Sequence, residues 1–293
     1  MGILTPSVDN NIISVSAVLS HPTWIRAKLD ELAEGNELVS LFFSPHGKPV
    51  QGGGILHPRL SSAARYTADD VVERAPGDEY QAVRAIDPEY RLAAVRDYGA
   101  KVSVTDEEIA RGDISALNNK MLQLSNTLLR KLNVKALEAI DAAGPASLVA
   151  TAAWDTFVTV GPDTGITPNA ERPLADMMRA RLAAEQDRLG ITLDTLVTSP
   201  QDATNLSIGY GVELTQVLAA ARLTLVTNPY IPEGRVYLTA KGKAGTVGFE
   251  APLTVDIIDK RENREKIVQV YAVPAYAVDR PQAVKVVTGT VTP

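Results

Sequence analysis

The chain has 293 residues, which is enough for one large domain or two modest ones. Its 45% hydrophobic content excludes disorder throughout, the net charge of −6 comes without the basic stripe of a bulk nucleic-acid binder, and the lack of cysteine excludes disulfides and thiolate chemistry. The N-terminus lacks the pattern of a signal peptide, and no stretch approaches the ~20 apolar residues of a membrane span, so we expect a soluble cytoplasmic protein.

Residues 1–47 are expected to form an N-terminal arm with one short helix. The first twenty residues have no clear hydrophobic period and are interpreted as extended. A helix is expected to begin after His21-Pro22 and to end before Gly35. The apolar run from Leu38 to Phe43 has the length of a strand.

Residues 48–97 are predicted to form a long polar hairpin. Its arms are expected at Ile55-Leu56 and at Tyr80 to Ile86, with a turn at Pro76-Gly77-Asp78. A ribbon this polar has too little apolar surface to be stable alone, so it must lie on another surface or stay mobile until a partner arrives. The alternative is a surface insertion without a role.

The longest helical pattern of the chain follows. Lys101 to Val104 alternates like a strand, and Thr105 to Glu108 forms a capping box that opens a short helix closed by Gly112. A helix is predicted over residues 113–143, with Asp113 as N-cap and Gly144-Pro145 as its end. Its apolar residues recur every three or four positions: Ile114, Leu117, Met121, Leu124, Leu128, Leu132, Ala136 and Ile140.

At 1.5 Å per residue this helix is roughly 45 Å long, which exceeds the diameter of a small domain. We therefore expect surfaces outside a single compact core to use its length. The alternative is a long core helix of an ordinary α/β enzyme.

The second half of the chain has a mixed α+β pattern. A strand is predicted from Trp154 to Val160, and a helix starts at Ser199-Pro200. Between them a helix is predicted from Pro173 toward Gly190, with an apolar face made of Leu174, Met178, Leu182 and Leu189. Short strands are expected late in the chain, at residues 223–227, 235–239, 253–258, 267–273 and 283–287.

The sequence offers no constellation for catalysis. The three histidines lie in the first fifth of the chain without zinc-motif spacing, and none follows Ser207, so a Ser-Asp-His order cannot be completed. Glycines 52–54 and residues 241–245 lack the spacing of a phosphate loop. We expect no catalytic residue, no cofactor and no metal. An arm, a polar hairpin and a very long helix are instead what a protein needs when its partners are copies of itself.

The order of these pieces resembles the major capsid proteins of tailed bacteriophages with the Hong Kong 97-type fold. The resemblance covers about residues 20–289. The segments that resemble the family are residues 38–43 with 47–54 (LVSLFF and GKPVQGGG), 73–80 (ERAPGDEY), 98–140 (from YGAKVSVTDEEIARG onward), 194–206 (DTLVTSPQDATNL), 249–263 (FEAPLTVDIIDKREN) and 268–289 (VQVYAVPAYAVDRPQAVKVVTG).

The resemblance implies an α+β capsid fold with an N-terminal arm, an extended E-loop hairpin, a peripheral domain with a long spine helix, and an axial domain. The hairpin would occupy residues 48–97, the peripheral domain 98–195, the axial domain 196–257 and the closing strands 258–293. The implied function is a shell of hexamers and pentamers around double-stranded DNA, with no sequence-specific binding. The virion would be assembled in the host cytoplasm with a portal protein and a separate scaffolding protein, and without a membrane.

Two features depart from parts of the family. The N-terminal part is too short for a fused scaffolding domain, and no lysine lies between Lys48 and Lys101, so a hairpin lysine for crosslinking is missing. An encapsulin-like nanocompartment shell around protein cargo is the second interpretation, and an unrecognised cytoplasmic α+β enzyme is the third. In a shell, charge pairs between subunits are expected along the hairpin, at Arg59, Arg65, Asp69, Asp70, Glu73, Arg74, Asp78, Glu79 and Arg84.

Overall fold

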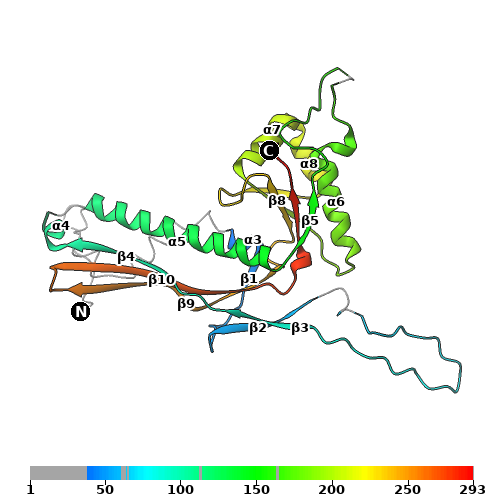
Figure 1. Cartoon of the computed structure of the whole chain (residues 1–293), viewed down its shortest axis with the longest axis horizontal. Coiled ribbons are helices and arrows are strands. Elements are labelled where there is room, and N and C mark those ends of the chain that lie inside the picture. The colour runs from blue at the N-terminus through cyan, green and yellow to red at the C-terminus, as the bar shows by residue number, and fades with distance from the viewer. Residues whose placement is uncertain (1–37, 61–63, 65, 112–113, 163–164, 293) are drawn as a thin grey trace, which may run out of the picture.

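The structure is a computed structural model that describes residues 38–292 except 61–63, 65, 112–113 and 163–164. The expected extended segment and the short helix before Gly35 lie outside the described residues. Figure 1 shows an elongated molecule, with a long helix on a narrow sheet at one end, a second sheet with helices beside it, and a hairpin that projects from their junction.

The narrow sheet has four strands in the order β1-β9-β10-β4. Their bounds are β1 Phe43–Pro45, β9 Gly245–Lys260, β10 Glu265–Ala277 and β4 Tyr98–Thr105. β9 and β10 form a long antiparallel hairpin whose register slips between Tyr271 and Pro274, and β4 pairs antiparallel with β10. β1 pairs parallel with β9, so residues near the start of the described chain close a sheet made near its end.

The expected capping box is confirmed at the start of α4 (Asp106–Arg111). Thr105 Oγ1 accepts from the Glu108 amide at 3.3 Å, and Glu108 Oε2 accepts from the Thr105 amide at 3.1 Å. Lys120 from the following helix pairs with Glu108 at 2.8 Å. The bond from Lys120, followed by that from the Thr105 amide, lowers the pKa of the Glu108 carboxyl.

The predicted long helix is confirmed as α5 (Ile114–Ala142), which has 29 residues. Leu124 and Leu128 are buried on the narrow sheet, where they meet Val104, Val255, Val268 and Val270. Ala136 and Ile140 are buried further along the same face, and Asn126, Lys131 and Glu138 are exposed as expected. Asp113 and the side chains of Ile114, Leu117 and Met121 lie outside the described part.

The second sheet has five strands in the order β5-β11-β8-β6-β7. Their bounds are β5 Ala146–Val149, β11 Val284–Thr288, β8 Arg235–Thr239, β6 Thr195–Thr198 and β7 Thr224–Thr227. The helices α6 (Pro173–Gln186), α7 (Pro200–Tyr210) and α8 (Leu214–Ala221) share its core. The single-turn helices are η2 Asn169–Glu171, η3 Gly211–Glu213 and η4 Pro281–Ala283. Ser199 caps α7 as predicted, because its hydroxyl accepts from the Asp202 amide.

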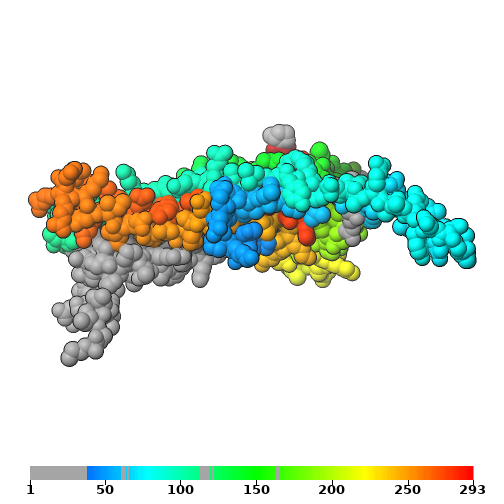
Figure 2. Space-filling view, turned by 90° about the horizontal axis from the view of Figure 1, so that it is seen from below, coloured from blue at the N-terminus to red at the C-terminus, as the bar shows by residue number. Residues whose placement is uncertain are grey.

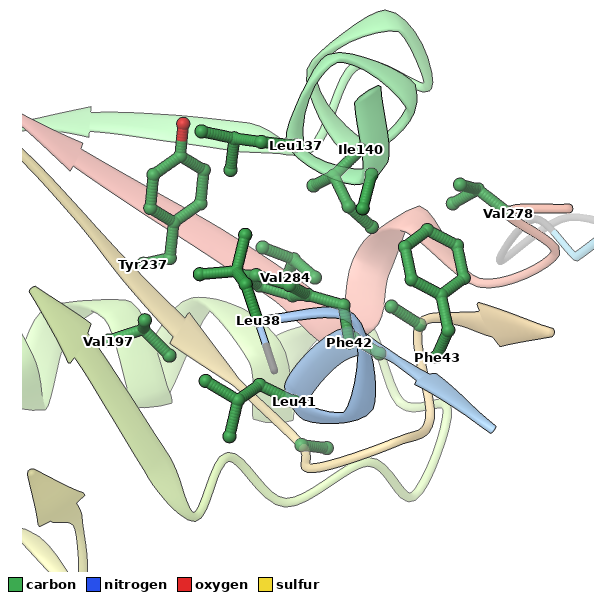
Figure 3. Close-up of a cluster of buried hydrophobic side chains, with 14 of the residues drawn as sticks. Leu38, Leu41, Phe42, Phe43, Leu137, Ile140, Val197, Tyr237, Val278 and Val284 are labelled. Atoms are coloured by element: carbon green, nitrogen blue, oxygen red, sulfur yellow. The ribbon is translucent and has the colours of Figure 1, made fainter. Parts of the chain in front are cut away.

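One apolar cluster joins the two sheets to α5 (Figure 3). The prediction of a strand over Leu38 to Phe43 is wrong, because Val39–Phe42 is a single helical turn, α3. A helical turn brings Leu38, Leu41 and Phe42 to one side, where all are buried, whereas a strand would alternate them. They fill the space between Ile140 of α5 and Tyr237 of β8.

Two predictions for the second half need correction. Residues Trp154 to Val160 form no strand; Trp154 is buried and its indole N–H donates to the buried Asp176 carboxylate at 3.1 Å.

The helix α6 starts at Pro173 as expected but turns its other face inward. Met177, Ala180 and Ala184 are buried, while Met178 and Leu182 are 45% and 53% exposed. Small side chains on the inner face let the helix approach the core closely.

The expected peripheral and axial domains had boundaries at residues 195 and 257, but the strands and helices pack across both boundaries. β5 and α6 pack with the five-stranded sheet, although both precede residue 195. β9 runs across residue 257 and pairs with β10 in the narrow sheet. The late strands predicted from the sequence are all present, within β7 to β11. In the described residues no helix is long and apolar enough to cross a membrane.

Candidate assembly surfaces

The projecting hairpin begins as a regular antiparallel pair. β2 (Gly54–Arg59) pairs with β3 (Glu89–Ala94), with Leu56 opposite Leu92 and Arg59 opposite Glu89. The first arm is confirmed, but the returning arm is not Tyr80 to Ile86, which forms no strand. That stretch is exposed along its whole length, whereas β3 pairs with β2 and partly buries Ala93 against the small cluster that contains Ile55.

The inner face of the ribbon packs on the body. Ile55 is 7% exposed and contacts a small cluster with Val50, Ala275 and Ala277, and His57 is 9% exposed on the same face. The ribbon is entered through Gly52 and Gly53, whose φ angles of 76° and 80° favour glycine. The cluster is small, so other contacts must help to fix the direction of the hairpin.

Three hydrogen bonds attach the root of the hairpin to the rest of the chain. Arg59 Nη2 donates to the Ala143 carbonyl at 2.8 Å, the Leu60 amide donates to the Asp279 carbonyl at 2.8 Å, and the Arg96 amide donates to the Pro274 carbonyl at 3.1 Å. They connect the ribbon to the end of α5, to the segment before η4 and to β10.

The titratable side chain of His57 is buried at this root, and that of Asp279, from the body, is partly buried. Burial lowers the pKa of His57, and the nearby Asp279 carboxylate partly opposes that shift. Burial raises the pKa of Asp279, although Arg280 lies 3.9 Å from its carboxylate. His57 Nδ1 and Asp279 Oδ1 are buried without a hydrogen-bond partner.

The outer face of the ribbon is apolar and uncovered. Leu56 is 67% exposed, Leu92 opposite it is 66% exposed, and Tyr90 beside them is 61% exposed. Sequence reasoning concentrated on the charges of this region and missed these residues. The signal was present in the alternation of Leu56 and Pro58 with Ile55 and His57.

The distal part of the hairpin extends beyond the body, as Figure 2 shows from a second direction. The predicted turn at Pro76-Gly77-Asp78 is confirmed, with the Asp78 amide bonded to the Ala75 carbonyl. Val71, Val72 and Tyr80 are 82%, 66% and 81% exposed. The tip therefore presents apolar side chains as well as charges.

The charged residues predicted for subunit contacts divide into two kinds. Some have partners in their own chain: Arg59 with Ala143, Asp69 with Arg84 at 3.7 Å, and Arg74 with the Asp78 carbonyl at 2.6 Å and the Tyr80 ring at 4.8 Å. Asp70 is exposed and accepts from the Val71 amide at 2.8 Å, and Glu73 and Glu79 have exposed side chains. Arg65 lies outside the described residues.

A second apolar surface lies at the far end of the five-stranded lobe. Val160, Ile208 and Val212 are 83%, 77% and 96% exposed around a groove of about 410 Å³. In the ranges that the structure covers, no group of three or more His, Asp or Glu side chains could hold a metal ion. This groove and the outer face of the ribbon are both exposed apolar surfaces.

Comparison with solved structures identifies the fold. A virus-like particle from Pyrococcus furiosus is 16% identical, with a TM-score of 0.61 over 90% of this chain and 97% of that chain. A structure from Mycobacterium phage Bobi is 13% identical, with a TM-score of 0.61 over 85% and 89%. The capsid of Myoviridae phage XM1 is 11% identical, with a TM-score of 0.58 over 87% and 92%. The chain therefore has the α+β Hong Kong 97-type capsid fold.

The family follows from the sequence itself. Residues 89–287, more than half of the chain, match the profile of the phage capsid protein family, and the chain belongs to this family. No curated protein matches the chain. It is a structural capsid protein of the virion.

Proposed function

We propose that this protein is the major capsid protein that builds the icosahedral head shell of a tailed phage, as hexamers and pentamers around double-stranded DNA. The observation that carries the proposal is the hairpin, whose outer face leaves Leu56, Tyr90 and Leu92 exposed at 61–67%. Monomeric proteins rarely leave such patches uncovered, and a neighbouring subunit would cover this one in a shell.

The parts of the molecule take the following roles in this proposal. The hairpin is the E-loop that reaches a neighbour, and α5 with the narrow sheet is the peripheral domain. The five-stranded lobe is the axial domain, whose tip at Val160, Ile208 and Val212 meets other copies around the axis of a capsomer. Asp70, Glu73 and Glu79 are exposed and would pair with cations of neighbouring subunits.

The remaining partners follow from the same role. With a net charge of −6 the subunit would enclose DNA without gripping it or reading its sequence. A portal protein and a separate scaffolding protein would take part in assembly, which would occur in the host cytoplasm.

A nanocompartment that encloses protein cargo is the second candidate. It is favoured by the likeness to the virus-like particle from Pyrococcus furiosus, whose TM-score of 0.61 equals that of the phage Bobi structure. The match to the phage capsid family supports the virion instead.

Two measurements test the proposal. Negative-stain microscopy of the purified protein should show shells or capsomers, and a uniform small particle under all assembly conditions would contradict a shell. Particles isolated from infected or lysogenic cells should then be treated with nuclease and opened. Protected double-stranded DNA supports the head shell, and a copurifying enzyme without DNA supports the nanocompartment.

A further inference from the structure

The residues that follow β11 form a short strap across the five-stranded lobe, where the chain continues toward α7 (Figure 1). The Gly289 amide donates to the Gly234 carbonyl at 3.0 Å, and the Thr290 carbonyl accepts from the Trp154 amide at 2.6 Å. Residues 289–292, which we call the strap, therefore join the turn before β8 to the loop after β5.

One strap side chain is buried at the start of α7. Thr290 is fully buried, and its hydroxyl donates to Asp202 Oδ1 at 2.7 Å. The other oxygen of that carboxylate accepts from the hydroxyl of Ser199, the N-cap of α7, also at 2.7 Å. Asp202 is itself fully buried, so loss of the Thr290 hydroxyl would leave Asp202 Oδ1 without this donor in the interior of the lobe.

The outer end of the strap is held at the surface by an exposed carboxylate. The Thr292 amide donates to Asp155 Oδ2 at 3.0 Å, and the Thr292 hydroxyl donates to Asp155 Oδ1 at 2.9 Å. The bond from the Thr292 amide is the largest cause of the lowered pKa of the Asp155 carboxyl, so the ionised form is the one that the strap binds. The strap thus contacts two successive residues, Trp154 and Asp155, at the start of one loop.

The continuation of this loop carries part of the exposed tip of the lobe. Phe157 lies on α7 at Gly209, where a Cβ atom would collide with its ring. The Thr159 hydroxyl donates to the Gly209 carbonyl at 2.7 Å, and Val160, the next residue, is 83% exposed. The position of Val160 therefore depends on α7 and, through the start of the loop, on the strap.

We propose that the strap holds the loop of residues 154–160 in the shape that a second copy of this chain contacts, with Thr290 as the positioning residue. The proposal rests on the proposed shell function, in which the tip of the lobe meets other subunits. Without the Thr290 hydroxyl the strap loses its buried anchor and the loop opens locally, while the sheet persists because β11 ends before the strap. The exposed side chains of Val160, Ile208 and Val212 then lose their fixed arrangement.

Two substitutions of Thr290 separate its hydroxyl from its shape. Thr290→Val keeps the branched side chain without the hydroxyl, and Thr290→Ser keeps the hydroxyl. Hydrogen exchange is measured by mass spectrometry on unassembled full-length subunits, in peptides that cover residues 154–160. Exchange there should be about tenfold faster in Thr290→Val, as expected when a buried acceptor loses its donor. Thr290→Ser should exchange close to the natural rate.

The strand β10 is the internal reference, because it belongs to the narrow sheet and makes none of the strap contacts above. Its amides should keep their natural exchange rate in both variants. Thr254→Val is the matched control, since the Thr254 hydroxyl bonds to the Pro252 carbonyl at the surface of the narrow sheet. It should leave exchange in residues 154–160 unchanged. Natural exchange of this loop in Thr290→Val, or an equal acceleration in β10, would overturn the strap.

Asp155→Ala keeps the proposal testable if Thr290→Val fails to fold. Asp155 is exposed, so this substitution leaves no buried polar group and releases only the outer end of the strap. Exchange in residues 154–160 should rise about threefold, the size expected for an ordinary hydrogen bond. An unchanged rate contradicts the proposal.

Particle formation by the same variants is followed by sedimentation and negative-stain microscopy. Thr290→Val should give far fewer particles than the natural protein, and Thr290→Ser should restore them. Normal particle yield from a Thr290→Val subunit with a faster-exchanging loop would show that assembly does not need the strap. If the natural protein forms no particles under any condition, the shell function fails, whereas the exchange rates of single subunits still decide whether the strap holds the loop.

Discussion

The guanidinium of Arg59 donates a 2.8 Å hydrogen bond to the carbonyl of Ala143, just beyond the last turn of α5. A helix C-terminus carries partial negative charge and unsatisfied carbonyls, so a cation is favoured at this position. The contact links the projecting hairpin directly to the end of the long helix. Arg59, which was expected to pair with a neighbouring subunit, therefore has a partner in its own chain.

Replacing Arg59 with alanine should lower the free energy of unfolding by about 1–2 kcal/mol, because one charge-assisted hydrogen bond and the helix-end attraction are lost. Thermal unfolding of the unassembled subunit measures this effect. Arg91→Ala is the control: its side chain pairs with Glu89 at the surface, and we expect a change below about 0.5 kcal/mol. Equal effects of the two substitutions would contradict the role of the helix-end contact.

Leu56 and Leu92 should matter for assembly and not for the fold. Both are about two thirds exposed and opposite each other, so replacing both with serine removes little buried area from the subunit. We expect an unchanged unfolding temperature and a loss of particles in sedimentation and microscopy. Normal assembly of the double variant would show that this face is not covered by a neighbour.

The face of α5 gives a prediction for stability. Leu124 is 5% exposed against the narrow sheet, and a buried Leu→Ala change typically costs ~2–5 kcal/mol. Leu124→Asp should cost more, because the carboxylate has no partner there, and should yield insoluble or unassembled protein. Asn119→Asp, on the exposed side of the same helix, should be tolerated. Normal assembly of Leu124→Asp would contradict the orientation of the helix.

Protease sensitivity should depend on assembly. The distal hairpin has few contacts with the body, and Arg74 and Arg84 are exposed. Limited trypsin digestion followed by mass spectrometry should give cuts after these residues in free subunits and few cuts in shells. Equal cutting in both states would indicate that the hairpin is not an interface.

The shell should be held together without covalent bonds between subunits. The chain has no cysteine, and no lysine lies between Lys48 and Lys101. Boiled particles should therefore run as one band near 31.3 kDa on a denaturing gel. A ladder of multimers would reveal a crosslink made by another lysine.

Periodicity in the sequence predicted the elements that bury a regular stripe. The capping box at Thr105, the apolar face of α5 through Leu124 and Leu128, and the late strands from residue 223 onward follow from local pattern and are confirmed. The turn at Pro76-Gly77 follows from the conformational preferences of those two residues.

The errors arose where contacts distant in sequence decide the outcome. Leu38 to Phe43 has the composition of a strand, but the space between Ile140 and Tyr237 accepts a helical turn. In α6 the small residues Ala180 and Ala184 face inward because the core is close, while Met178 and Leu182 remain outside. The local sequence could not identify the strand that pairs with β2. Residues 80–86 and β3 are both largely exposed, so their hydrophobic patterns are similar.

Both sheets join strands that are far apart in the sequence. β1 pairs with β9 across roughly two hundred residues, and β5 pairs with β11, which ends at Thr288. Closing such large loops costs chain entropy before any contact is gained, so these pairings form slowly. A ribosome-bound chain cannot complete the narrow sheet before β10 has been synthesised, nor the five-stranded sheet before β11. We therefore expect nascent subunits to remain open until then, exposed to chaperones for longer than a chain built from local contacts.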